Sequence, residues 1–326
     1  TAGMQNTGSF TRYQSLIPDS HQGGVFLNAN YRFGSELELF AELLATRYQL
    51  DSISSPPILQ LASVPASNPF NPFGTTVRVS GVVQGAEQLS TFTFDENFVR
   101  PVIGARGSVG TWDWELSALA SRDKGARSTY GLANTALLNA ALASSDPRTA
   151  LNPFVDGPMA SPDVLASIYS NSAVVSHKGN ATIVDAFARG ALLDLPAGPL
   201  AAVLGAEYER SSLSQGTFDA NRTDGALFAE LRAPLVAGAD DRGARREVLA
   251  VQGAARYDNY SDFGAKTTWQ AGVEFRPVET VLLRGTYATA FKPPTLYNLA
   301  APLATFSVPV SDPRRNGEVV IVPLTQ

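Results

Sequence analysis

Alternation of apolar and polar residues is the dominant pattern along the chain, and it recurs in segments of about ten residues. In Gly24–Phe33 every second residue is apolar. After a Gly-Ser link the alternation resumes at Leu37, with Glu36, Glu38 and Glu42 on the opposite face. Two long alternating runs joined by so short a link predict a β-hairpin. The three glutamates could form a cation site, but their position on one strand face is more typical of residues that line a water-filled lumen.

Four further hairpins follow the same scheme, and turn-forming residues separate the paired runs in most of them. The paired runs are Val99–Val109 with Trp112–Ser121, Thr182–Leu195 with Leu200–Arg210, Thr223–Pro234 with Glu247–Tyr257, and Thr267–Arg276 with Val281–Thr289. The third pair is joined by a longer polar link that is rich in Asp and Arg. The sequence therefore predicts about ten strands of roughly nine to thirteen residues, longer than the roughly five or six of common soluble strands.

Two connections, Leu50–Phe98 and Arg122–Ala181, are too long for ordinary loops and are rich in Pro, Ser, Asn and Gly. In the second we expect helices at Leu132–Ala143 and at Pro162–Tyr169, the latter with Ser161 as its N-cap. Short turns at one end of the strands and long connections at the other are typical of outer-membrane β-barrels. Such barrels have short periplasmic turns and long extracellular loops.

Charged residues of the predicted strands lie almost entirely opposite the apolar positions. They are Arg100, Arg106, Asp113, Glu115, Asp185, Arg189, Glu207, Glu209, Glu230, Arg232, Arg256, Asp258, Glu274, Arg276 and Arg284. Arg47 and Asp194 are exceptions, and both lie near strand ends. A charge on the lipid face of a barrel costs about 2–4 kcal/mol at the midplane and little near the interface. The segregation therefore favours a barrel wall with one face in lipid.

Aromatic residues on the apolar face fall into two groups. One group lies beside the short turns, namely Phe33, Trp112, Trp114 and Phe275, and the other toward the long connections, namely Tyr208, Tyr257, Trp269 and Tyr287. Two aromatic bands are typical of a barrel that meets two membrane interfaces. We therefore predict an all-β fold: an antiparallel transmembrane β-barrel, of which about ten strands are present. The alternative is a soluble sheet whose apolar face packs on a partner sheet.

Composition narrows these classes further. Charged residues make up 17% of the 326 residues and hydrophobic residues 44%, which is too apolar for a disordered chain. No apolar run approaches the roughly 18 residues of a transmembrane helix. The net charge of -5 argues against nucleic acid as a partner. The chain has no cysteine, which excludes thiolate chemistry.

Signatures of catalysis are absent, so we predict no enzyme and assign no catalytic, cofactor-binding or metal-binding residues. No common catalytic or phosphate-binding motif is present, and the glycines of 104–110 do not match the dinucleotide fingerprint. We expect these glycines to thin a strand wall and form a turn. His21 and His177 are the only histidines, and we expect His177, beside Lys178, to lie in a solvated loop.

Four segments carry a more specific signal. They are NPFNPFG at 68–74, DLPAGPL at 194–200 followed by GAEY at 205–208, RYDNYSDFG at 256–264, and LRGTYATAFKPPTL at 283–296. In order and spacing they resemble the β-barrel part of TonB-dependent receptors of Gram-negative outer membranes. Ala197, Glu209 and the Lys292-Pro293 pair depart mildly from the family's pattern. The resemblance covers residues 23–315.

The resemblance implies a receptor that captures a scarce extracellular substrate and imports it into the periplasm with energy transmitted by TonB. Its implied location is the outer membrane, and its implied partners are outer-membrane lipid, the TonB complex, and a small molecule such as a siderophore, cobalamin or an oligosaccharide. TonB would act through an N-terminal plug and its TonB box. No cofactor is implied. Selectivity lies in the plug and loop tips, so no substrate-binding residue can be assigned.

Barrels of this family have about 22 strands and a plug. We therefore expect residues 1–326 to form one partial barrel domain that lacks the plug and the later strands. Ten strands with two open edges leave unpaired backbone groups in hydrocarbon, so the chain alone should aggregate. The alternatives are a plug-less porin-type passive channel and, less favoured, a soluble secreted β-rich protein. That protein would be a binding module or a glycoside-acting enzyme in which Glu207 and Glu230 line a cleft.

Overall fold

The computed structural model describes residues 13–34, 36–239, 243, 245–301, 305–312, 314 and 318–325. Its main sheet consists of β1 (Asp19–Phe33), β2 (Leu37–Ile53), β5 (Thr91–Val109), β6 (Trp112–Leu132), β7 (Asn171–Leu195), β8 (Gly198–Gln215), β9 (Phe218–Ala239), β10 (Arg245–Tyr260), β11 (Gly264–Phe275) and β12 (Leu283–Ala288). Smaller elements are β3 (Ile58–Val64), β4 (Val77–Val82), β13 (Thr305–Asp312), β14 (Glu318–Thr325), α1 (Thr135–Ala143), α2 (Pro162–Ile168) and α3 (Leu296–Ala300).

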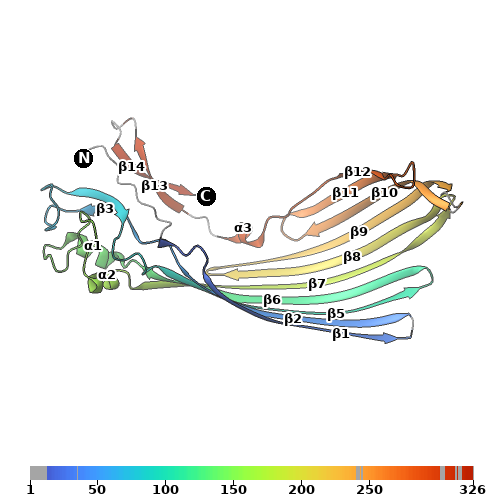
Figure 1. Ribbon diagram of the computed structural model, residues 1–326, viewed down its shortest axis with the longest axis horizontal. Helices are drawn as coiled ribbons and strands as arrows, with labels where there is room; N and C mark the ends of the chain where they lie inside the picture. The colour runs from blue at the N-terminus through green and yellow to red at the C-terminus, as the bar shows by residue number, and fades with distance from the viewer. Residues whose placement is uncertain are drawn as a thin grey trace. The chain divides into compact units, whose positions relative to one another are not determined.

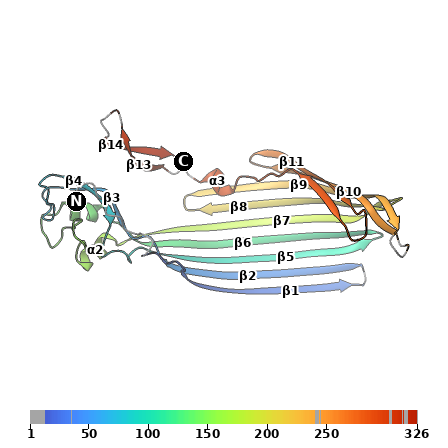
Figure 2. The same ribbon diagram turned by 45° about the horizontal axis from the view of Figure 1, so that its top comes forward.

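The main sheet has ten strands in the order β1-β2-β5-β6-β7-β8-β9-β10-β11-β12 (Figures 1 and 2). Each strand lies beside the next one predicted from the sequence, and the pairings from β8 to β12 are antiparallel. The predicted hairpins and their order are thus confirmed. In the described part of the chain the sheet does not close, and β1 and β12 are its edges. Aggregation of the isolated chain stays a prediction.

Most strands are longer than predicted, and the two long connections are correspondingly shorter. β7 has 25 residues and begins at Asn171 rather than Thr182, and β6 continues to Leu132. The connections shrink to residues 54–90 and 133–170. The alternation of apolar residues underestimates the strands because pairing can continue where both faces meet water and no apolar face is needed. β12 is the exception, with only 6 residues.

The short turns were predicted in the right places, and the turn between β7 and β8 is tighter than expected. β5 ends at Val109 and β6 begins at Trp112, with Gly110 at a positive φ of 61°. β7 and β8 are separated by only two residues, Pro196 and Ala197, because Gly198 already belongs to β8. β9 and β10 extend into the predicted Asp- and Arg-rich link. Most of what remains of that link, like Ser35 in the predicted Gly-Ser turn, lies outside the described residues.

The helices α1 and α2 confirm the two predicted helical pieces, with α1 starting three residues later than expected. Asn134 caps α1 by accepting a hydrogen bond from the Leu137 amide. Ser161 caps α2 by accepting from the Val164 amide, and Pro162 opens the helix, as its fixed φ favours. Among the described residues, no helix is long and apolar enough to cross a membrane.

The strand pair β3–β4 was not predicted from the sequence. It lies in the first long connection, and its register shifts between Leu59 and Ala62. Leu61 in this shift has a positive φ of 49°, which is uncommon for a residue with a side chain. The bulge breaks the period of two on which strand prediction from sequence depends.

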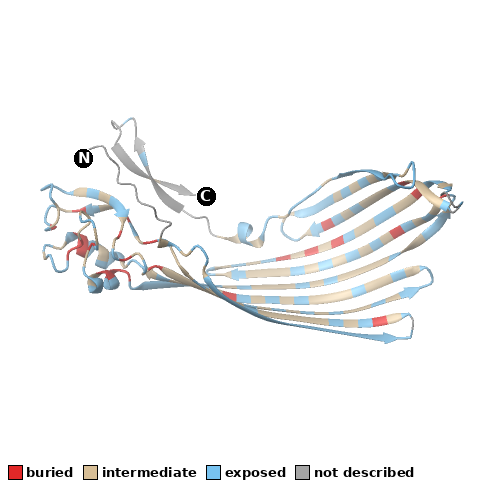
Figure 3. Ribbon diagram, in the orientation of Figure 1, coloured by how far each residue is buried: buried red, intermediate tan, exposed pale blue. Residues whose placement is uncertain are grey.

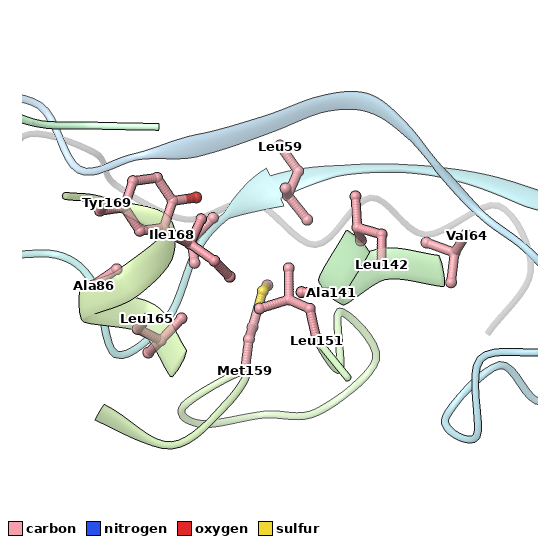
Figure 4. Close-up of a cluster of buried hydrophobic side chains, with 11 residues drawn as sticks. Leu59, Val64, Ala86, Ala141, Leu142, Leu151, Met159, Leu165, Ile168 and Tyr169 are labelled. Atoms are coloured by element: carbon pink, nitrogen blue, oxygen red, sulfur yellow. The ribbon is translucent and has the colours of Figure 1, made fainter. Parts of the chain in front are cut away.

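The chain divides into two compact units. The first comprises Thr1–Leu27, Leu43–Arg100 and Arg122–Lys178, and the second comprises Asn28–Glu42, Pro101–Ser121 and Gly179–Gln326. The buried core belongs to the first unit and is formed by Leu59, Val64, Val83, Ala86, Ala141, Leu142, Leu151, Met159, Leu165, Ile168 and Tyr169 (Figure 4). We call residues 54–90 and 133–170, which supply this core, the connection module.

In the second unit the strands alternate between less and more exposed residues instead of enclosing a core (Figure 3). In β11, for example, exposure alternates along 268–275. Large apolar side chains point to the more exposed side, among them Leu204, Leu227, Leu231 and Val273. A contiguous apolar face of this kind marks an interaction surface rather than a free surface in water.

Candidate functional site

The other face of the second unit carries the charged residues, and we call it the polar face. Glu38 accepts hydrogen bonds from Arg32 Nε at 2.7 Å and from Arg106 Nη2 at 2.5 Å. Its side chain is only 11% exposed. This pairing supports the lumen-lining prediction for Glu38, since its carboxylate is satisfied by arginines of its own protein.

Arginine–carboxylate pairs continue on the later strands. Arg256 donates to Glu207 and to Asp258, each at 2.7 Å. Arg232 donates to Glu247 at 2.5 Å and to Glu274 at 2.8 Å, thereby linking β9, β10 and β11. The charges predicted to share a face therefore do so, and cross-strand pairing of opposite charges reinforces the sheet.

A hollow of about 390 Å³ opens on the polar face around Arg256. Its lining includes Asp185, Glu207, Glu230 and Phe228, so both glutamates of the soluble-enzyme alternative border it. Glu207, however, forms an ion pair with Arg256. The residues that line the hollow belong to neighbouring strands of one sheet, and not to two sheets packed face to face.

Aromatic rings on the polar face were missed by the sequence analysis. Phe228 lies directly across from Gly205 in the β8–β9 register, and a Cβ at Gly205 would overlap the Phe228 ring. Phe40 lies over Gly104 in the same way, which confirms that Gly104 thins the wall. A glycine opposite an aromatic residue in the neighbouring strand is a signal that could have placed both rings.

Six of the eight aromatic residues predicted for the apolar face are exposed, whereas Trp112 and Trp114 are partly buried. Tyr208, Tyr257 and Trp269 are about half exposed and Tyr287 is 66% exposed. Trp269 and Tyr287 contact each other, with ring centroids 5.5 Å apart. Trp112 is less exposed because its ring packs across Gly190. Of the two charged exceptions, Arg47 pairs with Asp95 at 3.0 Å.

The connection module is the second candidate region, and Asn68 is its central polar residue. Asn68 is 2% exposed. Its Nδ2 donates to the carbonyl oxygens of Leu142 at 2.9 Å and Leu151 at 3.1 Å, and its Oδ1 accepts from the Phe70 amide. One asparagine therefore joins the two connections.

Two ionisable groups of the connection module differ in environment. Burial raises the pKa of Tyr169 to about 12, and its hydroxyl has no hydrogen-bond partner in the described part of the chain. Asp146 accepts hydrogen bonds from the Arg148 guanidinium, and this holds the pKa of the Asp146 carboxyl below its usual value. Neither group lies in an arrangement for catalysis.

The comparison with protein-family models decides the identity. The model described as TonB dependent receptor-like, beta-barrel matches residues 4–314. The chain belongs to the TonB-dependent receptor family. This family is a transporter family of the Gram-negative outer membrane. No curated protein matches the chain.

Two of the segments that resemble TonB-dependent receptors form one cluster in the structure. Arg222 donates to Asp262 of the RYDNYSDFG segment, from Nε at 2.8 Å and from Nη2 at 2.7 Å. The same Nη2 donates to the carbonyl oxygen of Pro294 in the LRGTYATAFKPPTL segment. The ring of Tyr260 stacks on Phe263, which in turn contacts Phe291. These segments therefore pack together at the end of the receptor wall where β10 turns into β11.

The NPFNPFG segment also has a structural role, because its two asparagines bond to backbone groups of the connection module. Asn71 donates to the carbonyl oxygens of Val64, Pro65 and Thr75, and Asn68 crosses to the second connection. Both asparagines accept from a backbone amide two residues later, as turn-forming asparagines do. The segment thus folds the connection module rather than presenting a ligand site.

Among the predictions for individual candidate residues, the structure contradicts the one for His177. It does not lie in a solvated loop, because β7 begins at Asn171 and carries it as a strand residue. Its side chain is only 18% exposed and stacks on Phe94 with ring centroids 5.8 Å apart. The alternation of 171–181 is too polar to be recognised as a strand from sequence alone.

Proposed function

We propose that this chain forms wall strands and extracellular loops of an outer-membrane receptor that imports a small molecule with energy from TonB. In this proposal the 326 residues are one partial barrel domain, and the plug on which TonB acts comes from outside this stretch of sequence. Lipid would contact the apolar face, and the polar face would line the lumen. The observation that carries the proposal is the segregation of apolar and arginine–carboxylate faces in a sheet of this family.

The connection module would help to capture the substrate. It has a buried core of its own and long-range bonds between its two connections, so it is an ordered structure at the strand ends from which it emerges. Ordered loops on a rigid scaffold are where binding residues concentrate. The substrate class stays open among siderophores, cobalamin and oligosaccharides.

Removal of part of the connection module tests this role. In the full-length receptor, residues 133–170 are replaced by a short Asn-Gly turn that leaves β6 and β7 intact. Uptake of labelled ferric siderophore, cobalamin and oligosaccharide is measured in cells with and without TonB. We expect one substrate to accumulate only with TonB, and the replacement to abolish its binding while the barrel stays folded.

A turn at the other end of the strands provides the control. Replacing Pro196 and Ala197 by Asn-Gly leaves the connection module untouched, so substrate binding should not change. Substrate affinity that survives the loss of residues 133–170 would contradict the capture role. Uptake that is the same without TonB and after the proton gradient is collapsed would favour the passive porin-type channel instead.

A further inference from the structure

Three side chains on consecutive strands of the first unit converge on one point. Glu96 lies on β5, Asp123 on β6 and His177 on β7, and these strands are neighbours in the sheet. One ligand atom from each lies within 4.8 Å of the others. His177 Nε2 is 3.7 Å from Asp123 Oδ2, longer than a hydrogen bond.

The position of the imidazole is fixed by its surroundings. One side of the ring stacks on Phe94, and a Cβ at Gly125 would lie 2.6 Å from His177 Cε1. Gly125 therefore leaves the space that the ring occupies. Asp123 and His177 are less exposed than their strand neighbours on either side, so both side chains point to the same face of the sheet. A donor group held by packing on two sides loses little entropy when it binds a ligand.

The charge of the cluster is unbalanced. In the described part of the chain no arginine or lysine forms an ion pair with Glu96 or Asp123, whereas the carboxylates of Glu38, Glu207, Glu247 and Glu274 all pair with arginines. Two partly shielded carboxylates beside one imidazole create a negative potential that a cation would neutralise.

We propose that Glu96, Asp123 and His177 bind one divalent transition-metal ion of the Zn²⁺ type. Zinc binds imidazole nitrogen and carboxylate oxygen at about 2.0–2.2 Å, so two donors around a tetrahedral ion lie about 3.4 Å apart. The 3.7 Å separation between His177 and Asp123 fits this spacing with little movement. The nitrogen donor favours Zn²⁺ over Ca²⁺ and Mg²⁺, which prefer all-oxygen sites.

Three protein ligands leave a coordination position for water. The ion would join β5, β6 and β7, the strands at which residues 54–90 end and residues 133–170 begin and end. Binding would therefore stiffen the base of the connection module. This inference goes beyond transport and does not depend on which molecule is imported.

The test uses the full-length receptor, purified from outer membranes in detergent and stripped of metal with a chelator. Zn²⁺ is titrated by calorimetry, and Co²⁺ absorption reports the ligand set. The His177→Gln variant should lose one Zn²⁺ site or bind it at least tenfold more weakly, because even outer-shell losses cost about 10–100-fold. An equal concentration of Ca²⁺ should not displace Zn²⁺.

The only other histidine of the chain offers a matched control. His21 also lies near an aspartate, 4.0 Å from Asp19, but its side chain is 75% exposed. His21→Gln should therefore bind Zn²⁺ as the wild type does. Glu96→Gln retains the imidazole on Phe94 and should also weaken Zn²⁺ binding at least tenfold. If His177→Gln does not fold, this variant therefore tests whether the cluster binds Zn²⁺. Wild-type affinity in either folded variant overturns the proposal.

Discussion

The two units of this receptor chain are stabilised in different ways. In the second unit, charged side chains pair across neighbouring strands of one sheet, as Arg232 does with Glu247 and Glu274. In the first unit, the connection module buries a core of its own, and Asn68 holds it by bonds to residues more than 70 positions away. A wall needs only neighbouring strands, whereas a loop module must bring distant segments together.

Of the variants that test this difference between the units, Asn68→Ala is expected to lower stability the most. The change leaves the buried carbonyl oxygens of Leu142 and Leu151 without a donor, and each unsatisfied buried group costs about 1–3 kcal/mol. The free energy of opening the module should fall by about 2–4 kcal/mol, measured by amide hydrogen exchange of residues 133–170.

Asn71→Ala is the comparison within the same NPFNPFG segment. Its bonds lie within residues 64–75 and are more exposed, so the loss should be about 0.5–1.5 kcal/mol and should leave 133–170 protected. Equal losses from the two variants would mean that Asn68 does not join the two connections.

Gly205→Ala tests the wall and should have a somewhat smaller effect. The new methyl group collides with the ring of Phe228 on the neighbouring strand, and overpacking of this kind costs about 1–3 kcal/mol. The urea midpoint for unfolding of the full-length receptor in detergent should therefore fall.

Gly225→Ala in β9 provides the matched control, because a Cβ there has nothing within 4 Å. Its urea midpoint should stay close to that of the wild type. Protection of residues 133–170 should be unaffected by either glycine variant. If Gly205→Ala changed that protection as much as Asn68→Ala does, the two units would not be stabilised separately.

Acidification should have the smallest effect, and it should be confined to the module. The Arg148 guanidinium lowers the pKa of Asp146, so the stabilisation is present above the ordinary aspartate pKa of about 4 and is lost as the pH falls through the lowered value. Peptic cleavage near residues 144–151 should rise as the pH falls below about 4. This rise should be absent in Asp146→Asn.

Asp156→Asn serves as the reference at each pH, since Asp156 forms no ion pair in the described part of the chain. Dividing the cleavage rate by that of this variant removes the pH dependence of pepsin itself. A pH response that is identical in Asp146→Asn and Asp156→Asn would exclude the Asp146–Arg148 pair as its source.

Local patterns were sufficient to predict the wall. Period-two alternation identified the ten strands, and the glycine of the Gly110 turn and the Ser161 cap act within a few residues of their own position. Strand ends were predicted poorly, as β7 shows, because a strand in water on both sides carries no apolar signal. The role of His177 was misjudged for the same reason.

The sequence by itself determined the order of hairpins, the segregation of charge from apolar surface, and the family to which the chain belongs. These features depend on residues that are near in sequence, where the alternation of side chains along a strand and the residues that form turns can be recognised directly. Only the tertiary structure decided which carbonyls Asn68 bonds, which ring fills the space beside Gly205, and that Glu96, Asp123 and His177 meet. Those contacts join residues on different strands, and they depend on the register with which the strands pair.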